Sequence, residues 1–166
     1  MNKIENFTLH NNRGDSVLNS NLEKWCDPTN PSNDIFGPVI RYSWVVDGVN
    51  YNKYNQPPRL ILNELPDASG FIGFEKGWEP DNCLLFDSIG DERMRLTVPW
   101  QLTESKNPES QKSPTSFAGV GAPCVNPSTG CLGLFGVDAW VEHAGMYYFE
   151  LNYHSGQFLW GKEIRD

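Results

Sequence analysis

Residues 39–52, Val-Ile-Arg-Tyr-Ser-Trp-Val-Val-Asp-Gly-Val-Asn-Tyr-Asn, are the stretch that decides the fold class. Apolar and polar side chains alternate on both sides of Asp47-Gly48, which is typical of two antiparallel strands joined by a two-residue turn. Both turn positions need a positive φ, which Asp and Gly tolerate, so the turn also sets the register. We therefore expect Trp44 to face Tyr51 across a β-hairpin.

The rest of the chain repeats this pattern of short apolar segments separated by turn residues. Strands are predicted at 60–62, 71–74, 83–86 and 93–98, and a three-stranded meander within 132–164. No useful helical periodicity and no internal repeat are present. About nine strands predict an all-β fold, either an antiparallel barrel shaped as a lipocalin-like cup, or a β-sandwich or jelly roll.

The length of 166 residues is that of one domain, so we expect 1–166 to form a single β domain. Its N-terminal segment, 1–35, is polar and broken by turn residues. Ser20 followed by Glu23 is a capping-box pattern that predicts a helical turn or two there. The segment 103–116 has no aliphatic or aromatic side chain to bury, and we expect it to be a mobile loop.

Charge and hydropathy patterning exclude two classes of partner. The chain has 21 acidic and 13 basic residues, a net charge of −8, and no basic cluster that would offset phosphates, so nucleic acid is not an expected partner. Neither a signal peptide nor an apolar run long enough to span a membrane is visible. We expect a soluble, cytoplasmic protein that does not bind membranes.

The four cysteines are Cys26, Cys83, Cys124 and Cys131. Without an export signal, free thiols are expected, although a disulfide between Cys124 and Cys131 would close the turn-rich loop between them. The cysteine spacing is not that of a zinc site, and the three histidines lack partners at metal-site spacing. We therefore predict neither a metal nor a cofactor.

A second predicted hairpin, centred on Ala144-Gly145, indicates a candidate ligand-binding site. A two-residue turn at these positions would pair Glu142 with Tyr147 and Trp140 with Phe149. Asp138 would lie on the same face, so two carboxyl groups would flank an aromatic surface. The opposite face is also partly apolar, which suits a core on one side and a pocket or partner on the other.

The leading functional hypothesis is the binding of a small organic ligand in an aromatic-lined barrel or cup, because such pockets combine apolar walls with a few polar groups. The predicted ligand-binding residues are Trp44, Tyr51, Trp140, Tyr147 and Phe149.

An enzymatic version of this hypothesis is an isomerase or cyclase that uses Asp138 and Glu142 as catalytic acid and base, since aromatic walls raise a carboxyl pKa. Two alternatives belong to other classes. A carbohydrate-binding jelly-roll module would stack exposed Trp and Tyr on sugar rings, and a structural or self-associating module would bury the aromatic faces in a homo-oligomer. No family motif distinguishes these hypotheses.

Overall fold

The computed structural model describes residues 2–27, 30–34, 36–57, 59–77, 79–103, 115–142 and 144–164. These residues contain fourteen strands and two short 3-10 helices: β1 (Ile4–Asn11), β2 (Ser16–Leu18), η1 (Asn19–Trp25), β3 (Cys26–Asp27), β4 (Asn30–Asp34), β5 (Val39–Val46), β6 (Val49–Tyr54), β7 (Leu60–Glu64), β8 (Gly70–Glu75), β9 (Cys83–Asp87), β10 (Glu92–Leu96), η2 (Trp100–Leu102), β11 (Ser116–Gly121), β12 (Gly136–Val141), β13 (Gly145–Asn152) and β14 (Gln157–Glu163). The expected all-β class is confirmed.

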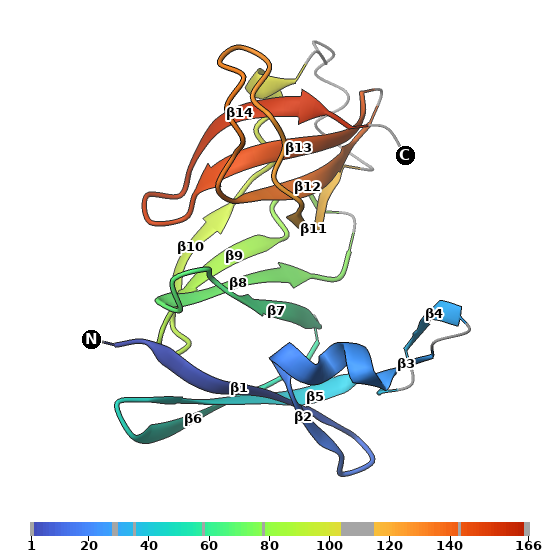
Figure 1. Cartoon of the computed structure of the whole chain (residues 1–166), viewed down its shortest axis with the longest axis vertical. Helices are drawn as coiled ribbons and strands as arrows, with labels where there is room; N and C mark the ends of the chain where they lie inside the picture. Colours follow the sequence, from blue (N-terminus) through green and yellow to red (C-terminus); the bar gives the residue numbers. More distant parts are fainter. Residues whose placement is uncertain are drawn as a thin grey trace.

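Three open, antiparallel, four-stranded sheets build the molecule, stacked in chain order along its long axis (Figure 1). The N-terminal sheet has the order β2-β1-β5-β6, the central sheet β10-β9-β8-β7 and the C-terminal sheet β11-β12-β13-β14, with β3 and β4 as a separate pair. No sheet closes into a barrel within the described residues. Among those residues, no helix is long and apolar enough to cross a membrane.

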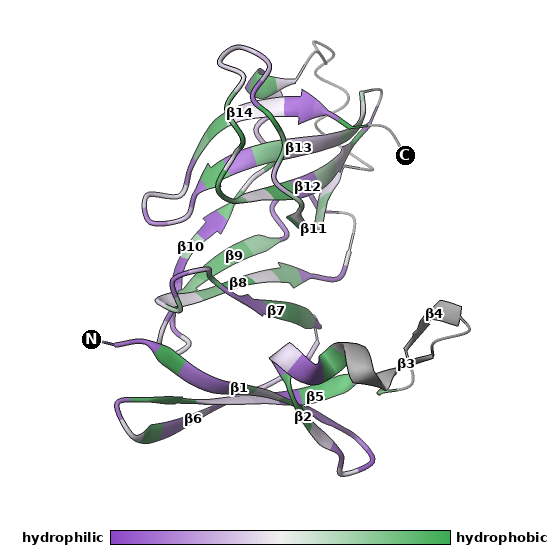
Figure 2. Cartoon of the chain, in the orientation of Figure 1, coloured by the Kyte–Doolittle hydropathy of each residue, from purple (hydrophilic) through white to green (hydrophobic). Residues whose placement is uncertain are grey.

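Two hydrophobic cores lie on the two faces of the central sheet. Phe71, Leu84 and Phe86 pack against the N-terminal sheet, whereas Ile72 and Leu85 pack against the C-terminal sheet. A sheet that is covered on both faces needs apolar side chains at successive positions, which explains the continuous apolar runs of β8 and β9. Figure 2 shows these two strands as the green middle of the molecule.

The hairpin of β5 and β6 has the predicted register. Val46 pairs with Val49 and Trp44 with Tyr51, and Asp47 and Gly48 both adopt a positive φ, of 50° and 77°. The local turn chemistry therefore determines this hairpin, as expected for a two-residue connection.

The N-terminal segment is more regular than the sequence predicts, because β1 lies inside the N-terminal sheet. Ile4 and Phe7 are both buried although they are three residues apart. Between Glu5 and Thr8 the pairing with β5 shifts, and Asn6 adopts a φ of 54°. An extra residue at such a bulge breaks the side-chain alternation by which a strand is recognised.

Two further predictions concern the helical turn near Ser20 and the loop at 103–116. The expected helical turn after β2 is present as η1. Most of the predicted mobile loop at 103–116 lies outside the described residues.

The buried polar side chain of Asn82 adds hydrogen bonds between the central and C-terminal sheets to the apolar packing of their shared core. Its Nδ2 donates to the carbonyl oxygens of Glu75 at 3.1 Å and of Phe117 at 3.0 Å. Its Oδ1 accepts the backbone N–H of Phe117 at 2.8 Å. The amide thus satisfies the backbone of β11 where no strand pairs with it.

Candidate functional site

Four of the five aromatic residues predicted to enclose a ligand are divided between the two cores. Trp44 is 2% exposed, stacks on Tyr51 with ring centroids 6.2 Å apart, and donates through Nε1 to the carbonyl of Ser88 at 2.7 Å. Tyr147 and Phe149 stack at 5.7 Å in the other core. The central sheet separates the two pairs, so the structure does not bring them into one pocket.

The predicted register of the second hairpin is wrong. Val141 pairs with Gly145, Ala139 with Tyr147 and Val137 with Phe149. The strands are therefore shifted by three residues from the pairing expected for a two-residue turn. An odd shift moves side chains to the opposite face of a sheet.

The shift changes the surroundings of the two proposed catalytic carboxyls. Asp138 pairs with Tyr148 on the outer face of the C-terminal sheet, where burial raises the pKa of its half-buried carboxyl. Glu142 lies in the turn after β12, and its backbone N–H donates to Thr115 Oγ1 at 3.1 Å. Neither carboxyl faces Tyr147 or Phe149 in the manner predicted.

Trp140 lies apart from the other four aromatic residues. It is 39% exposed and lines an apolar groove of about 540 Å³ with Ile61, Phe117 and Met146, where the central and C-terminal sheets meet.

Glu150, which sequence reasoning missed, anchors the segment 122–135 to the outer face of the C-terminal sheet. Glu150 is 6% exposed, and its carboxylate accepts the backbone N–H of Leu134 at 2.7 Å and a hydrogen bond from the hydroxyl of Tyr148. Burial and this hydrogen bond raise the pKa of Tyr148. A carboxylate within the apolar run of β13 was the available sequence signal.

Cys83, Cys124 and Cys131 carry free thiols, so the alternative disulfide between the last two is not formed. The side chain of Cys26 lies outside the described residues. Within the described part of the chain, no three His, Cys, Asp or Glu side chains form a group that could hold a metal ion.

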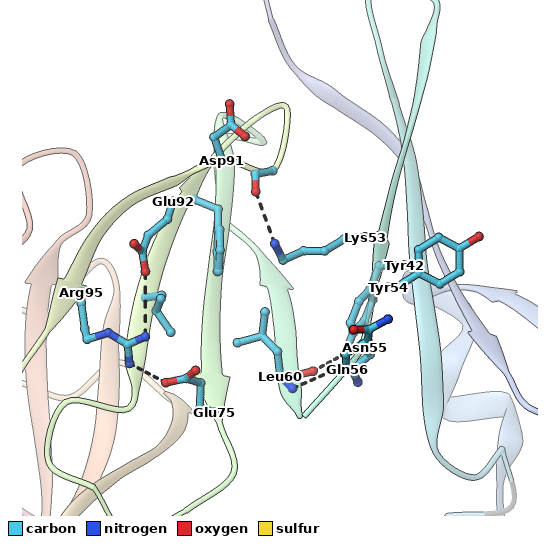
Figure 3. Close-up of a pocket in the computed structure, with 13 residues that line it drawn as sticks. Tyr42, Lys53, Tyr54, Asn55, Gln56, Leu60, Glu75, Asp91, Glu92 and Arg95 are labelled. Carbon is cyan, nitrogen blue, oxygen red and sulfur yellow. Dashed lines mark hydrogen bonds and ion pairs between the residues drawn. The ribbon is translucent and has the colours of Figure 1, made fainter. Parts of the chain in front are cut away.

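A cleft between the N-terminal and central sheets is the candidate site (Figure 3). Its volume is about 640 Å³. Leu84 and Phe86 of β9 supply apolar lining, Lys53 extends from β6, and Arg95 extends from β10. Since β6 and β10 are the edge strands of their sheets, the cleft opens between two sheet edges.

Two side chains of the N-terminal sheet hold one wall of the cleft in place. Tyr42 Oη donates to the carbonyl of Leu60 at 2.8 Å, and Asn55 Oδ1 accepts the N–H of Leu60 at 2.7 Å. Tyr42 Oη also accepts the N–H of Leu62 at 3.3 Å. These bonds cover backbone groups of β7, an edge strand whose exposed groups would otherwise invite pairing.

Charged groups surround the apolar lining. Arg95 forms an ion pair with Glu75 and lies 3.9 Å from Glu92. The hydrogen bond to Glu75 raises the pKa of the guanidinium. Asp91 is the third carboxylate of the lining and Lys53 the second cation, so the negative charges outnumber the positive ones by one.

Sequence reasoning missed this cleft because its lining comes from six strands between residues 42 and 95. Only the pairing of Tyr42 with Lys53 follows from the predicted hairpin register. The other residues that line the cleft belong to no sequence motif that would predict their position.

No family model matches the sequence, and no curated protein is significantly similar. Among solved structures, the chain is similar to a chain of "Structure of Tne2 in complex with Tni2", with a TM-score of 0.63 and 12% sequence identity. The match covers 98% of this chain and 99% of that chain. At this identity the similarity concerns the fold alone.

Proposed function

We propose that this chain is a protein-binding module that receives a basic segment of a partner protein in the cleft between the N-terminal and central sheets. The observation that carries the proposal is the lining of the cleft, which combines apolar side chains with the carboxylates of Glu75, Asp91 and Glu92. A lysine or arginine side chain can bury its methylene stem on such a surface while its charged end meets a carboxylate.

The rim of the cleft has features of a protein interface. Tyr54, next to Lys53, is 69% exposed, and exposed tyrosines are enriched among residues that dominate binding energy. The cleft opens between the edge strands β6 and β10, which suits an extended segment better than a compact molecule.

Two global properties support the same class of function. The net charge of −8 would steer a basic partner towards the molecule. The similar solved chain belongs to a complex of Tne2 with Tni2, so a chain with this fold occurs within a complex.

A small organic ligand is the second candidate. The cleft volume of about 640 Å³ lies within the range usual for ligand pockets. This candidate retains the expected ligand class but moves the site from the predicted aromatic face to the cleft.

Site-specific photo-cross-linking tests the main proposal. A benzophenone amino acid replaces Tyr54 at the cleft rim or, as the control, Leu134, which is 90% exposed in the segment anchored to the outer face of the C-terminal sheet. In an extract of the source cells, we expect one protein to cross-link from position 54 and not from position 134. Cross-linking from position 134 alone would contradict the proposal.

Purified cross-linked partner then allows a quantitative test by calorimetry. Glu92→Gln removes a carboxylate at the cleft, whereas Asp47→Asn removes the same charge in the β5–β6 turn. We expect about tenfold weaker binding and a smaller salt dependence for Glu92→Gln, and less than about twofold weakening for Asp47→Asn. Equal effects would mean that only net charge matters and would exclude the cleft.

A further inference from the structure

Lys53 already occupies the cleft. Its ammonium group lies 4.7 Å from the ring centroid of Phe86 and 3.5 Å from the carbonyl oxygen of Gly90. Figure 3 shows the side chain of Lys53 extending across the cleft towards the turn that carries Asp91. An aromatic face and a carbonyl oxygen together form a surface suited to a cation.

The groups that face Lys53 are held by contacts that do not involve it. Phe86 is 4% exposed. Gly90 adopts a φ of 89° and packs against the ring of Trp44, so closely that a Cβ at this position would lie 2.9 Å from that ring. The Gly90 N–H donates to the carbonyl of Asp87 at 3.1 Å, and the Asp91 N–H donates to the Asp87 carboxylate at 2.9 Å. The cation-binding surface is therefore preformed.

The hold on Lys53 itself is weak. Its hydrogen bond to Gly90 is at the long end of the accepted range. Among the described residues, no carboxylate lies within ion-pair distance of its ammonium group, whereas Arg95 on the opposite side of the cleft contacts both Glu75 and Glu92. A lysine side chain on a flexible stem can leave such a position for water.

We propose that the cleft contains a cation subsite, formed by the ring of Phe86 and the carbonyl oxygen of Gly90, which Lys53 fills until an alkylammonium or guanidinium group of a ligand displaces it. This inference rests on the proposed function and names the side chains that the cleft selects: lysine or arginine of the partner segment. Lys53 thus lowers the affinity of the cleft for weak cations, because each ligand must first displace it.

A titration with N-acetyl-L-arginine amide, monitored through the backbone amide resonances of Gly90 and Asp91, tests the subsite without any partner. Lys53→Met keeps the stem but removes the charge, and Lys162→Met removes the same charge from the C-terminal sheet. We expect Lys53→Met to bind the probe about tenfold more tightly than the wild type, and Lys162→Met to remain within about twofold of it. Lys53→Gln serves as the second neutral variant if Lys53→Met does not fold.

N-acetyl-L-citrulline amide, the neutral analogue, should not bind Lys53→Met detectably. Equal binding of the two probes, or an unchanged affinity for the arginine probe in Lys53→Met, would overturn the subsite. So would Lys53-dependent binding of N-acetyl-L-aspartate amide to the wild type, because it would make Lys53 an anion receptor.

The two proposals fail separately. If Lys53→Met binds the arginine probe but no protein cross-links at position 54, the subsite stands and the protein-binding function falls. If a partner binds the cleft but Lys53→Met changes neither probe nor partner affinity, the function stands and the subsite falls.

Discussion

Asn82→Ala should destabilise the protein by removing the hydrogen bonds that this side chain makes between the central and C-terminal sheets. The substitution removes three hydrogen bonds of a side chain that is 4% exposed: those to the carbonyls of Glu75 and Phe117 and the one from the Phe117 N–H. At about 1 kcal/mol for each bond, the free energy of unfolding should fall by about 3 kcal/mol. The backbone groups left without partners add to this loss.

Urea unfolding followed by tryptophan fluorescence measures the effect, with Asn50→Ala as the matched control. Asn50 is an exposed strand residue of β6, so its substitution should change the free energy of unfolding by less than about 0.5 kcal/mol. In a thermal scan, the loss for Asn82→Ala corresponds to a decrease in Tm of about 6–12 °C for a chain of this size.

Asn82→Asp sharpens the test, because it keeps the acceptor for Phe117 but places a negative oxygen against two carbonyl groups. We expect this variant to be less stable than Asn82→Ala at neutral pH. A loss below about 1 kcal/mol for Asn82→Ala, or a loss equal to that of Asn50→Ala, would refute the inference that this amide joins the sheets.

Three further predictions concern the C-terminal sheet and the thiols. Glu150→Gln should lower the free energy of unfolding by about 1–3 kcal/mol and speed hydrogen exchange of the Leu134 amide, because the buried carboxylate accepts that N–H; unchanged exchange would contradict the anchoring role. Burial raises the pKa of Asp138 above its ordinary value of 3.8, so the folded chain binds this proton more tightly than the unfolded chain, and stability falls as the pH rises from 3.8 through the raised pKa. In urea unfolding, Asp138→Asn should therefore be as stable as the wild type below pH 3.8 and more stable than the wild type once the pH exceeds the raised pKa. Equal stability of the two proteins at every pH would count against the burial of this carboxyl. Iodoacetamide labelling located by mass spectrometry should modify exposed Cys131 well before Cys83, whose thiol pKa burial raises, and labelling at equal rates would show that the central sheet opens readily.

Side-chain periodicity was sufficient to predict the register of a hairpin where the turn residues and the burial pattern agree. In the hairpin of β5 and β6, the Asp47-Gly48 turn and the apolar alternation lead to the same register, and both are local properties. In the hairpin of β12 and β13, three residues, 142–144, connect the strands instead of the two expected at Ala144-Gly145. The register there follows the burial of Val137 and Val141. Both faces of that segment carry apolar residues, so the alternation did not identify the core face.

The strand β11 was missed for a different reason. Its sequence, Ser-Phe-Ala-Gly-Val-Gly, contains two glycines and has little strand propensity. Pairing with β12 on one side and the amide of Asn82 on the other supplies the hydrogen bonds that make it a strand. Tertiary contacts therefore override the local preference.

The candidate site could not be predicted in the same way. Lys53 belongs to β6, whereas Phe86 and Gly90 belong to β9 and the turn that follows it, and their meeting depends on how the N-terminal sheet lies on the central sheet. Four of the five predicted aromatic residues, all except Trp140, instead pack in the two cores, because a central sheet covered on both faces needs large apolar side chains on both of its neighbours.

The sequence by itself determined the all-β class, the acidic character and the strands whose alternation is uninterrupted, since these depend on composition and on residues close together in the chain. Only the tertiary structure decided that three open sheets stack in chain order, that Trp44 and Phe149 belong to different cores, and that a cleft with an internal cation lies between two sheet edges. The physical reason is that strand periodicity specifies which side chains share a face, whereas the partner of that face is chosen by packing among segments far apart in the sequence.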